Sequence, residues 1–186
     1  MVGLILITGS PGVGKSTVLL KTVELLRRRG HTVGGMVTTE ARDGGRRIGF
    51  RVVNLRTGQE GWLARTDSDQ GVRFGRYRIN ATDLENVGVA AVLQALSDEE
   101  VSVLAIDEVG PMELTNQRFR QVIERCKRTM KAVIATVHHS SRDSLLRELR
   151  EAPGARVVTV TLANREKLPE KLLEMVEEQR HTVNLS

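Results

Sequence analysis

The sequence has a single cysteine among its 186 residues, Cys126, and this scarcity excludes two classes of small protein. One cysteine cannot form an internal disulfide, and no cysteine–histidine cluster has the spacing of a zinc site. An ordinary apolar core must therefore stabilise the chain. Its length and its hydrophobic content of 40% are sufficient for one domain over residues 1–186. Because a chain without an internal disulfide is typical of a reducing compartment, we expect a cytoplasmic protein.

Long hydrophobic runs are also missing. The apolar start, residues 2–7, is too short for the hydrophobic part of a signal peptide or for a membrane span, and it leads into glycines and a lysine. We therefore expect no membrane partner, and we expect this run to form a buried strand.

Aromatic residues are scarce, with one tryptophan, one tyrosine and three phenylalanines. So few rings offer little surface on which the bases of a nucleic acid could stack. The net charge of +5 and the isoelectric point of 9.9 point the other way. The arginines are, however, spread from Arg27 to Arg180 and form no single cluster. We do not expect a nucleic-acid partner, and the composition favours no particular oligomeric state.

What the sequence contains is an alternation of apolar runs and amphipathic stretches. The runs predict strands at residues 4–7, 33–38, 101–106, 132–137 and 156–161. The amphipathic stretches predict helices at about 15–29, 82–96, 117–129, 142–150 and 165–179. Thr82 has capping-box spacing to Glu85, and Asn164 is the expected N-cap of the last helix. Strands buried on both faces and separated by helices indicate an α/β fold, with a mostly parallel sheet and helices on both faces.

The segment at about 39–79 breaks this alternation. It contains the turn signals Asp43-Gly44-Gly45 and Thr57-Gly58, β-rich stretches between them and no helical period. We interpret it as an antiparallel β-hairpin inserted into the single domain.

A phosphate-binding motif follows the first predicted strand and opens the first predicted helix. The pattern G-x-x-x-x-G-K-[ST] is matched by Gly9, Ser10, Pro11, Gly12, Val13, Gly14, Lys15 and Ser16. The glycines let successive backbone N–H groups point at a phosphate, and the helix adds its positive N-terminal end. Lys15 is expected to reach the β- and γ-phosphates, and the Ser16 hydroxyl to ligate Mg²⁺. An ordinary strand-to-helix turn with a chance lysine is the alternative.

Two acidic residues, Asp107 and Glu108, end the apolar run at 101–106. The carboxyl end of a central strand is where open α/β sheets bind ligands, beside the phosphate loop. Asp107 is therefore the expected acid on the Mg²⁺ side, acting directly or through a water. Glu108 is the expected base that orients or deprotonates a water facing the γ-phosphate. The pair favours hydrolysis of a nucleoside triphosphate over binding alone.

Other polar residues are candidates for the same site. Arg46 and Arg47 fall in the predicted insertion, from which a flexible arginine can reach a γ-phosphate within one chain or across a dimer. A solvated turn is the alternative for both, and Arg47 is the better candidate for catalysis. Thr39 and Glu40 follow the strand at 33–38 and are expected either near the metal and the attacking water or only in a capping turn.

Asn164 and Arg165 follow the last predicted strand, where P-loop proteins often contact the base or the ribose. An arginine stacked on a base discriminates poorly among bases, which fits broad specificity. A helix N-cap followed by a surface arginine is the alternative. His138 and His139 close the strand at 132–137, and a histidine pair in a loop is more often solvated than a metal site.

Four segments together resemble the thermophile-type nucleoside-triphosphatase family, which includes the human cancer-related nucleoside triphosphatase. They are the run from Gly9 to Thr17, the block Gly44-Gly45-Arg46-Arg47-Ile48-Gly49-Phe50, the segment from Ile106 to Leu114, and Asn164-Arg165. The resemblance extends over nearly the whole chain, and its two middle segments are more specific than the phosphate loop. Thr17 is included in the expected nucleotide-binding set on this basis.

The resemblance implies a RecA-like P-loop fold and slow, Mg²⁺-dependent hydrolysis of ATP, GTP, CTP and UTP to the diphosphate and phosphate. One position departs from the family, because Pro111 stands where the family usually has lysine. Arg47 is a candidate to supply the missing positive charge. A nucleotide or small-molecule kinase, and a regulatory NTPase stimulated by RNA, DNA or a protein, remain alternatives because both share the phosphate loop, Mg²⁺ and the acid pair.

Overall fold

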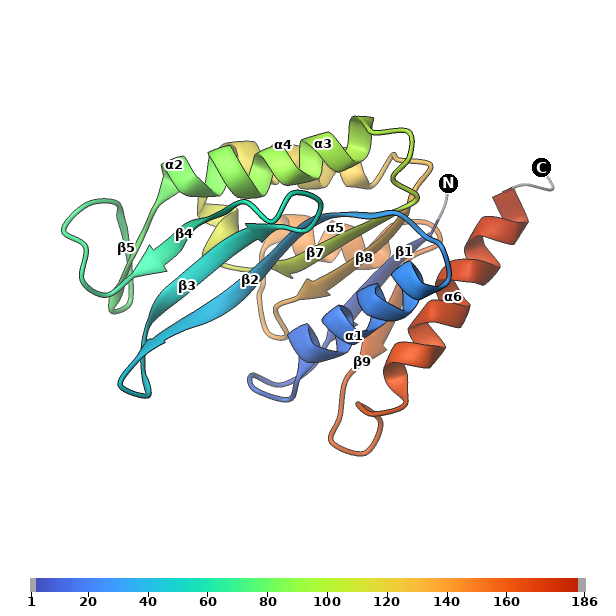
Figure 1. Cartoon of the computed structure of the whole chain (residues 1–186), viewed down its shortest axis with the longest axis horizontal. Coiled ribbons are helices and arrows are strands. Elements are labelled where there is room, and N and C mark those ends of the chain that lie inside the picture. The colour runs from blue at the N-terminus through green and yellow to red at the C-terminus, as the bar shows by residue number, and fades with distance from the viewer. Residues whose placement is uncertain (1–2, 184–186) are drawn as a thin grey trace.

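Nine strands form one continuous sheet in the computed structural model, which describes residues 3–183 and the side chains through residue 179 (Figure 1). Residues 1–2 and 184–186 of the expected domain lie outside this description. The strands are β1 (Leu4–Thr8), β2 (Val33–Asp43), β3 (Arg46–Asn54), β4 (Glu60–Arg65), β5 (Val72–Phe74), β6 (Tyr77–Ile79), β7 (Val103–Val109), β8 (Ala132–Val137) and β9 (Arg156–Thr159).

The helices follow β1, β6, β7, β8 and β9 in the sequence, and they pack on the sheet. They are α1 (Lys15–Arg28), α2 (Ala81–Asp83), the π-helical turn η1 (Leu84–Val89), α3 (Ala90–Ser97), the 3₁₀ turn η2 (Glu113–Thr115), α4 (Gln117–Cys126), α5 (Ser144–Glu151) and α6 (Leu168–Val183). Each strand and helix predicted from the sequence is present, with ends that differ by a few residues.

The strand order β5-β6-β4-β3-β2-β7-β8-β1-β9 divides the sheet into two halves. In the half β2-β7-β8-β1-β9 neighbouring strands are parallel. In the half β5-β6-β4-β3-β2 they are antiparallel. The α/β fold is thereby confirmed. The antiparallel part is larger than the predicted hairpin, because β2 continues without interruption from the parallel half and four further strands extend the same sheet.

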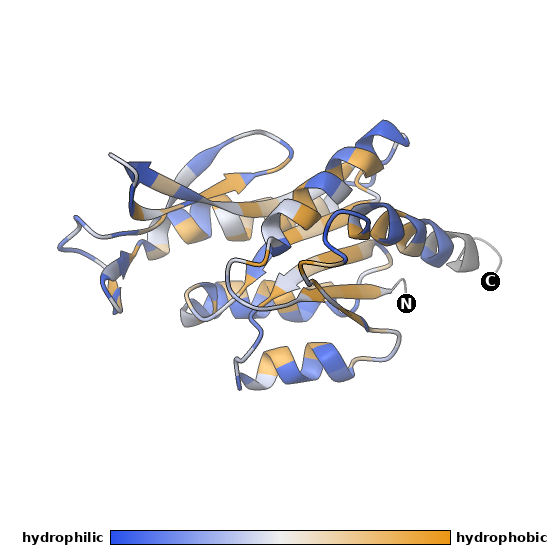
Figure 2. Ribbon diagram, turned by 90° about the horizontal axis from the view of Figure 1, so that it is seen from below, coloured by the Kyte–Doolittle hydropathy of each residue, from blue (hydrophilic) through white to orange (hydrophobic). Residues whose placement is uncertain are grey.

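Each face of the parallel half has its own apolar core. Ile5 and Ile7 of β1 pack in the cluster that includes α1 and α6, whereas Leu4 and Leu6 pack in the cluster that includes η1, α3, α4 and α5. Successive side chains of a strand point to opposite faces, so a continuous apolar run serves both. Figure 2 shows the result, with apolar strands inside and helices that are apolar on the inner side and polar on the outer.

Local hydrogen bonds determine where the helices begin and end. Gly30 ends α1 in a left-handed conformation (φ +84°), as expected, and the Asn116 side chain caps α4 by accepting from the Phe119 N–H at 2.9 Å. Two expected caps are wrong. Asn80, not Thr82, caps the helical segment that leads into η1, because its side chain accepts from the Asp83 N–H. Asn164 does not cap α6, which begins later, at Leu168.

Gly35 allows β2 and β7 to approach closely, and its replacement tests that contact. Its φ is +115°, and a Cβ at this position would lie 2.0 Å from the Ala105 carbonyl oxygen. We expect Gly35→Ala to lower the free energy of unfolding by about 2–5 kcal/mol, since both backbone strain and a steric clash oppose it. Urea denaturation measures the loss.

The matched control is Gly44→Ala in the β2–β3 turn. Gly44 also has a positive φ, +52°, but no atom of the described residues lies within 4 Å of the added Cβ. We expect a loss of only about 1 kcal/mol there. Equal losses at the two positions would contradict the close approach at Gly35.

Candidate functional site

The phosphate loop joins β1 to α1 in the conformation that its glycines permit. Gly9, Gly12 and Gly14 all have positive φ, and Gly14 precedes the first turn of α1. The Lys15 ammonium donates to the Gly9 carbonyl oxygen at 3.3 Å, across the mouth of the loop. No described side chain caps the backbone N–H groups of the first helical turn. They are therefore available to an anion, as the motif predicts.

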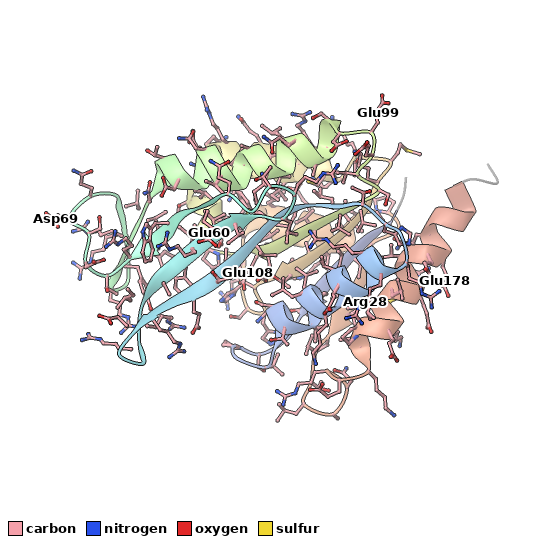
Figure 3. All side chains as sticks on the ribbon, viewed as in Figure 1. Arg28, Glu60, Asp69, Glu99, Glu108 and Glu178 are labelled. Carbon is pink, nitrogen blue, oxygen red and sulfur yellow. The ribbon has the colours of Figure 1, made fainter. Side chains whose placement is uncertain are left out.

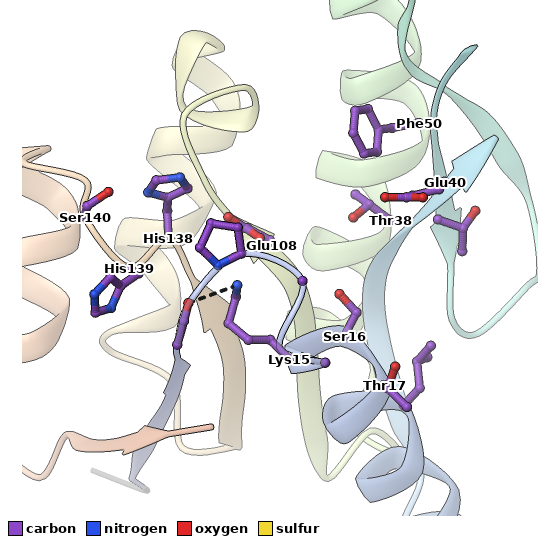
Figure 4. Close-up of a pocket in the computed structure, with 16 residues that line it drawn as sticks. Lys15, Ser16, Thr17, Thr38, Glu40, Phe50, Glu108, His138, His139 and Ser140 are labelled. Atoms are coloured by element: carbon purple, nitrogen blue, oxygen red, sulfur yellow. Dashed lines mark hydrogen bonds between the residues drawn. The ribbon is translucent and has the colours of Figure 1, made fainter. Parts of the chain in front are cut away.

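A pocket of about 560 Å³ opens above this loop at the carboxyl ends of the strands (Figure 4). Its floor is the loop with Lys15, Ser16 and Thr17. Glu108 lies in the centre of the view, and two walls face each other across the pocket. One wall comes from the β8 end and carries His138, His139 and Ser140, and the other comes from β2 and β3 and carries Thr38, Thr39, Glu40 and Phe50. The volume is within the range of pockets that take a small ligand.

Asp107 is fully buried at the end of β7, and its two oxygens differ in their surroundings. The Thr136 hydroxyl on the neighbouring strand β8 donates to Asp107 Oδ1. Asp107 Oδ2 is buried and has no hydrogen-bond partner within residues 3–183. Burial raises the pKa of Asp107 to about 6, and the hydroxyls of Thr136 and Ser16 oppose the rise. A partnerless carboxylate oxygen beside the Ser16 hydroxyl is a donor set suited to a hard divalent cation that keeps most of its water or phosphate ligands.

Glu108 and Glu113 form a second pair of acids close to Asp107. An ideal Cβ on Gly110 would lie 2.8 Å from Glu108 Oε1 and 3.0 Å from Glu113 Oε2, so a larger residue there would displace one or both carboxyl groups. Burial raises the pKa of Glu108, and the positive charge of Lys15 opposes the rise. Glu113 is 5% exposed, and burial raises its pKa to about 8, with the charges of Glu108 and Asp107 adding to the effect. Figure 3 shows Glu108 within the body of the molecule and Glu99 projecting away from it.

Arg47, expected near the γ-phosphate, is held by other groups. Its guanidinium donates to Glu40 Oε1 at 2.7 Å and to the Tyr77 hydroxyl at 2.9 Å, and it does not line the pocket. Arg47 lowers the pKa of Glu40, the pocket residue to which it is paired. Arg46 lies at the exposed end of the β2–β3 turn. The structure therefore brings Glu40, rather than either arginine, to the pocket.

Asn164 and Arg165 lie outside the phosphate pocket. The Asn164 side chain accepts from the Thr161 N–H and donates to the Thr159 carbonyl, so it holds the turn after β9. Arg165 lines a neighbouring recess of about 230 Å³ together with Gly14 and Thr17. Because Gly14 and Thr17 line both cavities, Arg165 lies beside the phosphate loop.

Two members of the motif do not line the pocket. The Ser10 carbonyl accepts from the Val13 N–H at 3.2 Å, which closes the loop. Val13 packs against the apolar cluster of α1 and α6. Gly9, Pro11, Gly12, Gly14 and the residues from Lys15 to Thr17 do line it.

Several residues of the site were not singled out from the sequence. Thr136 lies within an apolar run of the sequence. Its contact with Asp107 depends on the pairing of β8 between β1 and β7. Phe50 reaches the pocket because it pairs with Glu40 across β2 and β3. A register shift between Ala41 and Arg42 sets this pairing, so the turn at Gly44-Gly45 alone does not predict it. Glu113 carries no local signal of burial, since it is a charged residue just after the turn at Gly110-Pro111.

Comparisons with known proteins agree with this geometry. A family model described as "NTPase" matches residues 4–173. The nucleoside-triphosphatase THEP1 of Thermofilum pendens is 46% identical over 168 residues, which cover 90% of this chain and 91% of the relative. The same-named protein of Methanosarcina acetivorans is 44% identical over 169 residues, with coverage of 90% and 93%.

Two solved structures share the fold. The solution structure of a human cancer-related nucleoside triphosphatase matches with a TM-score of 0.81 at 32% identity, over 95% of this chain and 98% of that one. The crystal structure of THEP1 from Aquifex aeolicus matches with a TM-score of 0.79 at 28% identity, over 94% and 99%.

The sheet, the phosphate loop and these matches define a P-loop nucleoside triphosphatase fold. The chain belongs to the NTPase family that includes the THEP1 nucleoside-triphosphatases, as its sequence segments suggested, and it is a nucleoside-triphosphatase. Among the described residues, no helix has the length and apolar character needed to cross a membrane.

The burial of Glu113 predicts how stability depends on pH. In the native protein this carboxyl keeps its proton up to a pH of about 8, whereas the ordinary pKa of a glutamate is 4.5. The native state therefore holds one more proton than the unfolded chain between these values, and the free energy of unfolding falls as pH rises. A glutamine at this position has no proton to lose. The free energy of unfolding of Glu113→Gln minus that of the wild type should therefore rise by several kcal/mol from about pH 5 to pH 8.

Urea denaturation of the nucleotide-free protein at both pH values measures this difference. Asp107, whose raised pKa has the same sign, is present in both proteins and cancels. The control is Glu99→Gln, because Glu99 is exposed and its replacement should leave the pH dependence unchanged. Parallel pH profiles for Glu113→Gln and the wild type would show that Glu113 is ionised in the native state.

Proposed function

We propose that the chain hydrolyses nucleoside 5′-triphosphates to the diphosphate and phosphate with Mg²⁺ as cofactor, slowly and with little preference for the base. The observation that carries the proposal is the meeting of three features at one edge of the sheet. A phosphate loop, a buried carboxylate with a partnerless oxygen, and a second, partly buried carboxylate lie together there.

The phosphate loop would hold the triphosphate by its backbone. N–H groups of the loop and of the first turn of α1 point to the pocket floor, and the helix end adds a positive potential. Lys15, now bonded to the Gly9 carbonyl, would exchange this weak contact for the β- and γ-phosphate oxygens. The charge-assisted bond is the stronger of the two.

Ser16 and Asp107 are the residues that would hold Mg²⁺. The Ser16 hydroxyl would contact it directly, and Asp107 Oδ2 would contact it directly or through a water. When bound, Mg²⁺ neutralises charge on the β- and γ-phosphate oxygens. Thr136 would keep the Asp107 carboxylate in one orientation through its hydrogen bond to Oδ1.

Glu108 is the proposed general base. It lines the pocket in front of the phosphate loop, so a water between Glu108 and the γ-phosphate would be oriented by its carboxylate and would transfer a proton to it. Burial raises the pKa of Glu108 toward the working pH, which favours proton acceptance in the transition state. Arg47 would contribute only if its pair with Glu40 opened.

Broad base specificity is supported by the recess next to Thr17. Its wall includes the partly exposed Arg165 and the exposed Lys21 and Glu166, and Glu166 forms surface ion pairs with both basic residues. An arginine plane stacks on any base, and the exposed charged side chains around it offer no rigid donor–acceptor pattern for one base. A cytoplasmic location remains our proposal from the absence of disulfides.

Glu108→Gln should separate binding from chemistry. Gln keeps the size of Glu but cannot accept the proton of a water, so we expect phosphate release to fall by ~10²–10⁴ with little change in nucleotide affinity. Phosphate release from ATP, GTP, CTP and UTP with Mg²⁺ measures the rate, and a titration with a non-hydrolysable analogue measures affinity. Lys15→Ala is the control that should lose both.

If Glu108→Gln hydrolyses nucleoside triphosphates at the wild-type rate, Glu108 is not the general base, and Glu40 is the next residue to test. Parental turnover in Lys15→Ala would refute the phosphate site itself.

Asp107→Asn should change the dependence on Mg²⁺. An amide is a much weaker ligand for Mg²⁺ than a carboxylate, so we expect the variant to need a higher Mg²⁺ concentration for half-maximal rate and to reach a lower maximum. A Mg²⁺ titration of phosphate release measures both. Asp69→Asn, on an exposed loop far from the pocket, is the control (Figure 3). An unchanged titration curve in Asp107→Asn would contradict the assignment.

A further inference from the structure

A second, smaller cavity lies beside the phosphate pocket and has a different chemistry. Its volume is about 230 Å³, and its walls are largely apolar, from Phe50, Leu63, Phe74 and Met112. Phe50, Leu63 and Phe74 belong to the antiparallel extension, and Met112 belongs to the turn after β7. An engineered apolar cavity of about 150 Å³ is known to bind benzene, so this one has room for a molecule of roughly ten non-hydrogen atoms.

The two cavities share a border at the position where the γ-phosphate is expected. Thr38, Phe50, Glu108 and His138 line both of them. A molecule in the smaller cavity would therefore contact Glu108, the residue proposed to activate the attacking water. This adjacency is the contact that a phosphoryl acceptor requires.

The polar groups of the small cavity favour a neutral occupant that forms hydrogen bonds. No lysine or arginine of the described chain lines it, so nothing there would compensate the charge of a phosphate or carboxylate. Glu113 is only 5% exposed, and its raised pKa leaves it uncharged at neutral pH, with an O–H to donate. His138 Nδ1 is buried and has no hydrogen-bond partner within residues 3–183.

We propose that this cavity binds a small, neutral, mostly apolar alcohol and that the γ-phosphoryl group is transferred to its hydroxyl oxygen. The hydroxyl oxygen forms the new bond to the γ-phosphorus, and its proton passes to the Glu108 carboxylate. The bond from the γ-phosphorus to the bridging oxygen breaks, and its electron pair leaves with the nucleoside diphosphate. Hydrolysis is then the reaction that occurs when water occupies the acceptor position. The inference rests on the proposed function of the phosphate pocket.

The size of the cavity separates this proposal from a nucleotide kinase. A nucleoside monophosphate has more than twice the atoms that the cavity can hold, and its phosphate would meet the Glu108 carboxylate with no lysine or arginine of the described lining to offset the charge. An uncharged alcohol with a ring or a short branched chain meets both limits.

The stoichiometry of products tests the proposal. We would incubate the protein with MgATP and benzyl alcohol and measure ADP and phosphate in the same sample, with ³¹P NMR to detect benzyl phosphate. Hydrolysis alone gives equal ADP and phosphate. We expect ADP to exceed phosphate by the amount of benzyl phosphate formed. Glucose, which is polar throughout, should leave ADP and phosphate equal.

Filling the cavity should remove the transfer. Met112→Trp places a large ring in the cavity from a partly exposed position, so we expect ADP and phosphate to become equal again in that variant, whatever its absolute rate. Met130→Trp is the matched control, because Met130 is 61% exposed and lies on a distant turn. It should retain the excess of ADP.

Toluene provides a measurement that needs no variant. It has the ring of benzyl alcohol without the hydroxyl, so it should compete for the cavity and abolish the excess of ADP without supplying an acceptor. Hydrolysis with equal ADP and phosphate at every concentration of benzyl alcohol would overturn the acceptor site and leave the proposed NTPase activity standing. Transfer that persists in Met112→Trp and in toluene would also overturn it. Absence of any ADP would instead contradict the proposed function.

Discussion

Strand β7 lies between β2 and β8 and brings a carboxyl side chain into a part of the protein that water does not reach. Ionising Asp107 there is costly, because a buried charge loses its hydration. The hydroxyls of Thr136 and Ser16 and the charge of Lys15 compensate only part of that loss. A ligand with positive charge, such as the proposed Mg²⁺, would compensate the remainder. The buried carboxylate thus lowers the stability of the nucleotide-free protein, and the proposed cation would raise it on binding.

The same constraint explains the arrangement around the acid. Asp107 Oδ2 has no hydrogen-bond partner within residues 3–183, and the lack of a Cβ at Gly110 leaves space for the carboxyl groups of Glu108 and Glu113. Functional sites commonly retain unsatisfied groups that a stability optimum would remove. The rest of the parallel half is ordinary apolar packing between strands and helices, and it gives the rigidity that such a site requires.

Much of this molecule could be predicted from local sequence patterns. The phosphate loop depends on glycines at fixed spacing, and Asp107 follows an apolar strand, so both are signals within a few residues. Phe50, Thr136 and Glu113 could not be found in this way, since each reaches the site through a strand pairing or a turn that tertiary packing determines. Arg47 shows the converse limit. Its position in the chain suggested a role at the phosphate, but the nearer acid Glu40 holds it.

The division of the sheet into a parallel and an antiparallel half also has a consequence for how the chain folds. Pairing β2 with β3 closes a tight turn at Gly44-Gly45. Pairing β2 with β7 instead brings together Val33 and Val103, which lie far apart in the sequence. The entropy lost in closing a loop grows with its length, so the antiparallel meander has the smaller barrier to formation. Once formed, it presents β2 as a ready edge for the distant strand. The antiparallel meander that lines one side of the pocket in the native protein therefore also lowers the entropic cost of adding β7 to the sheet.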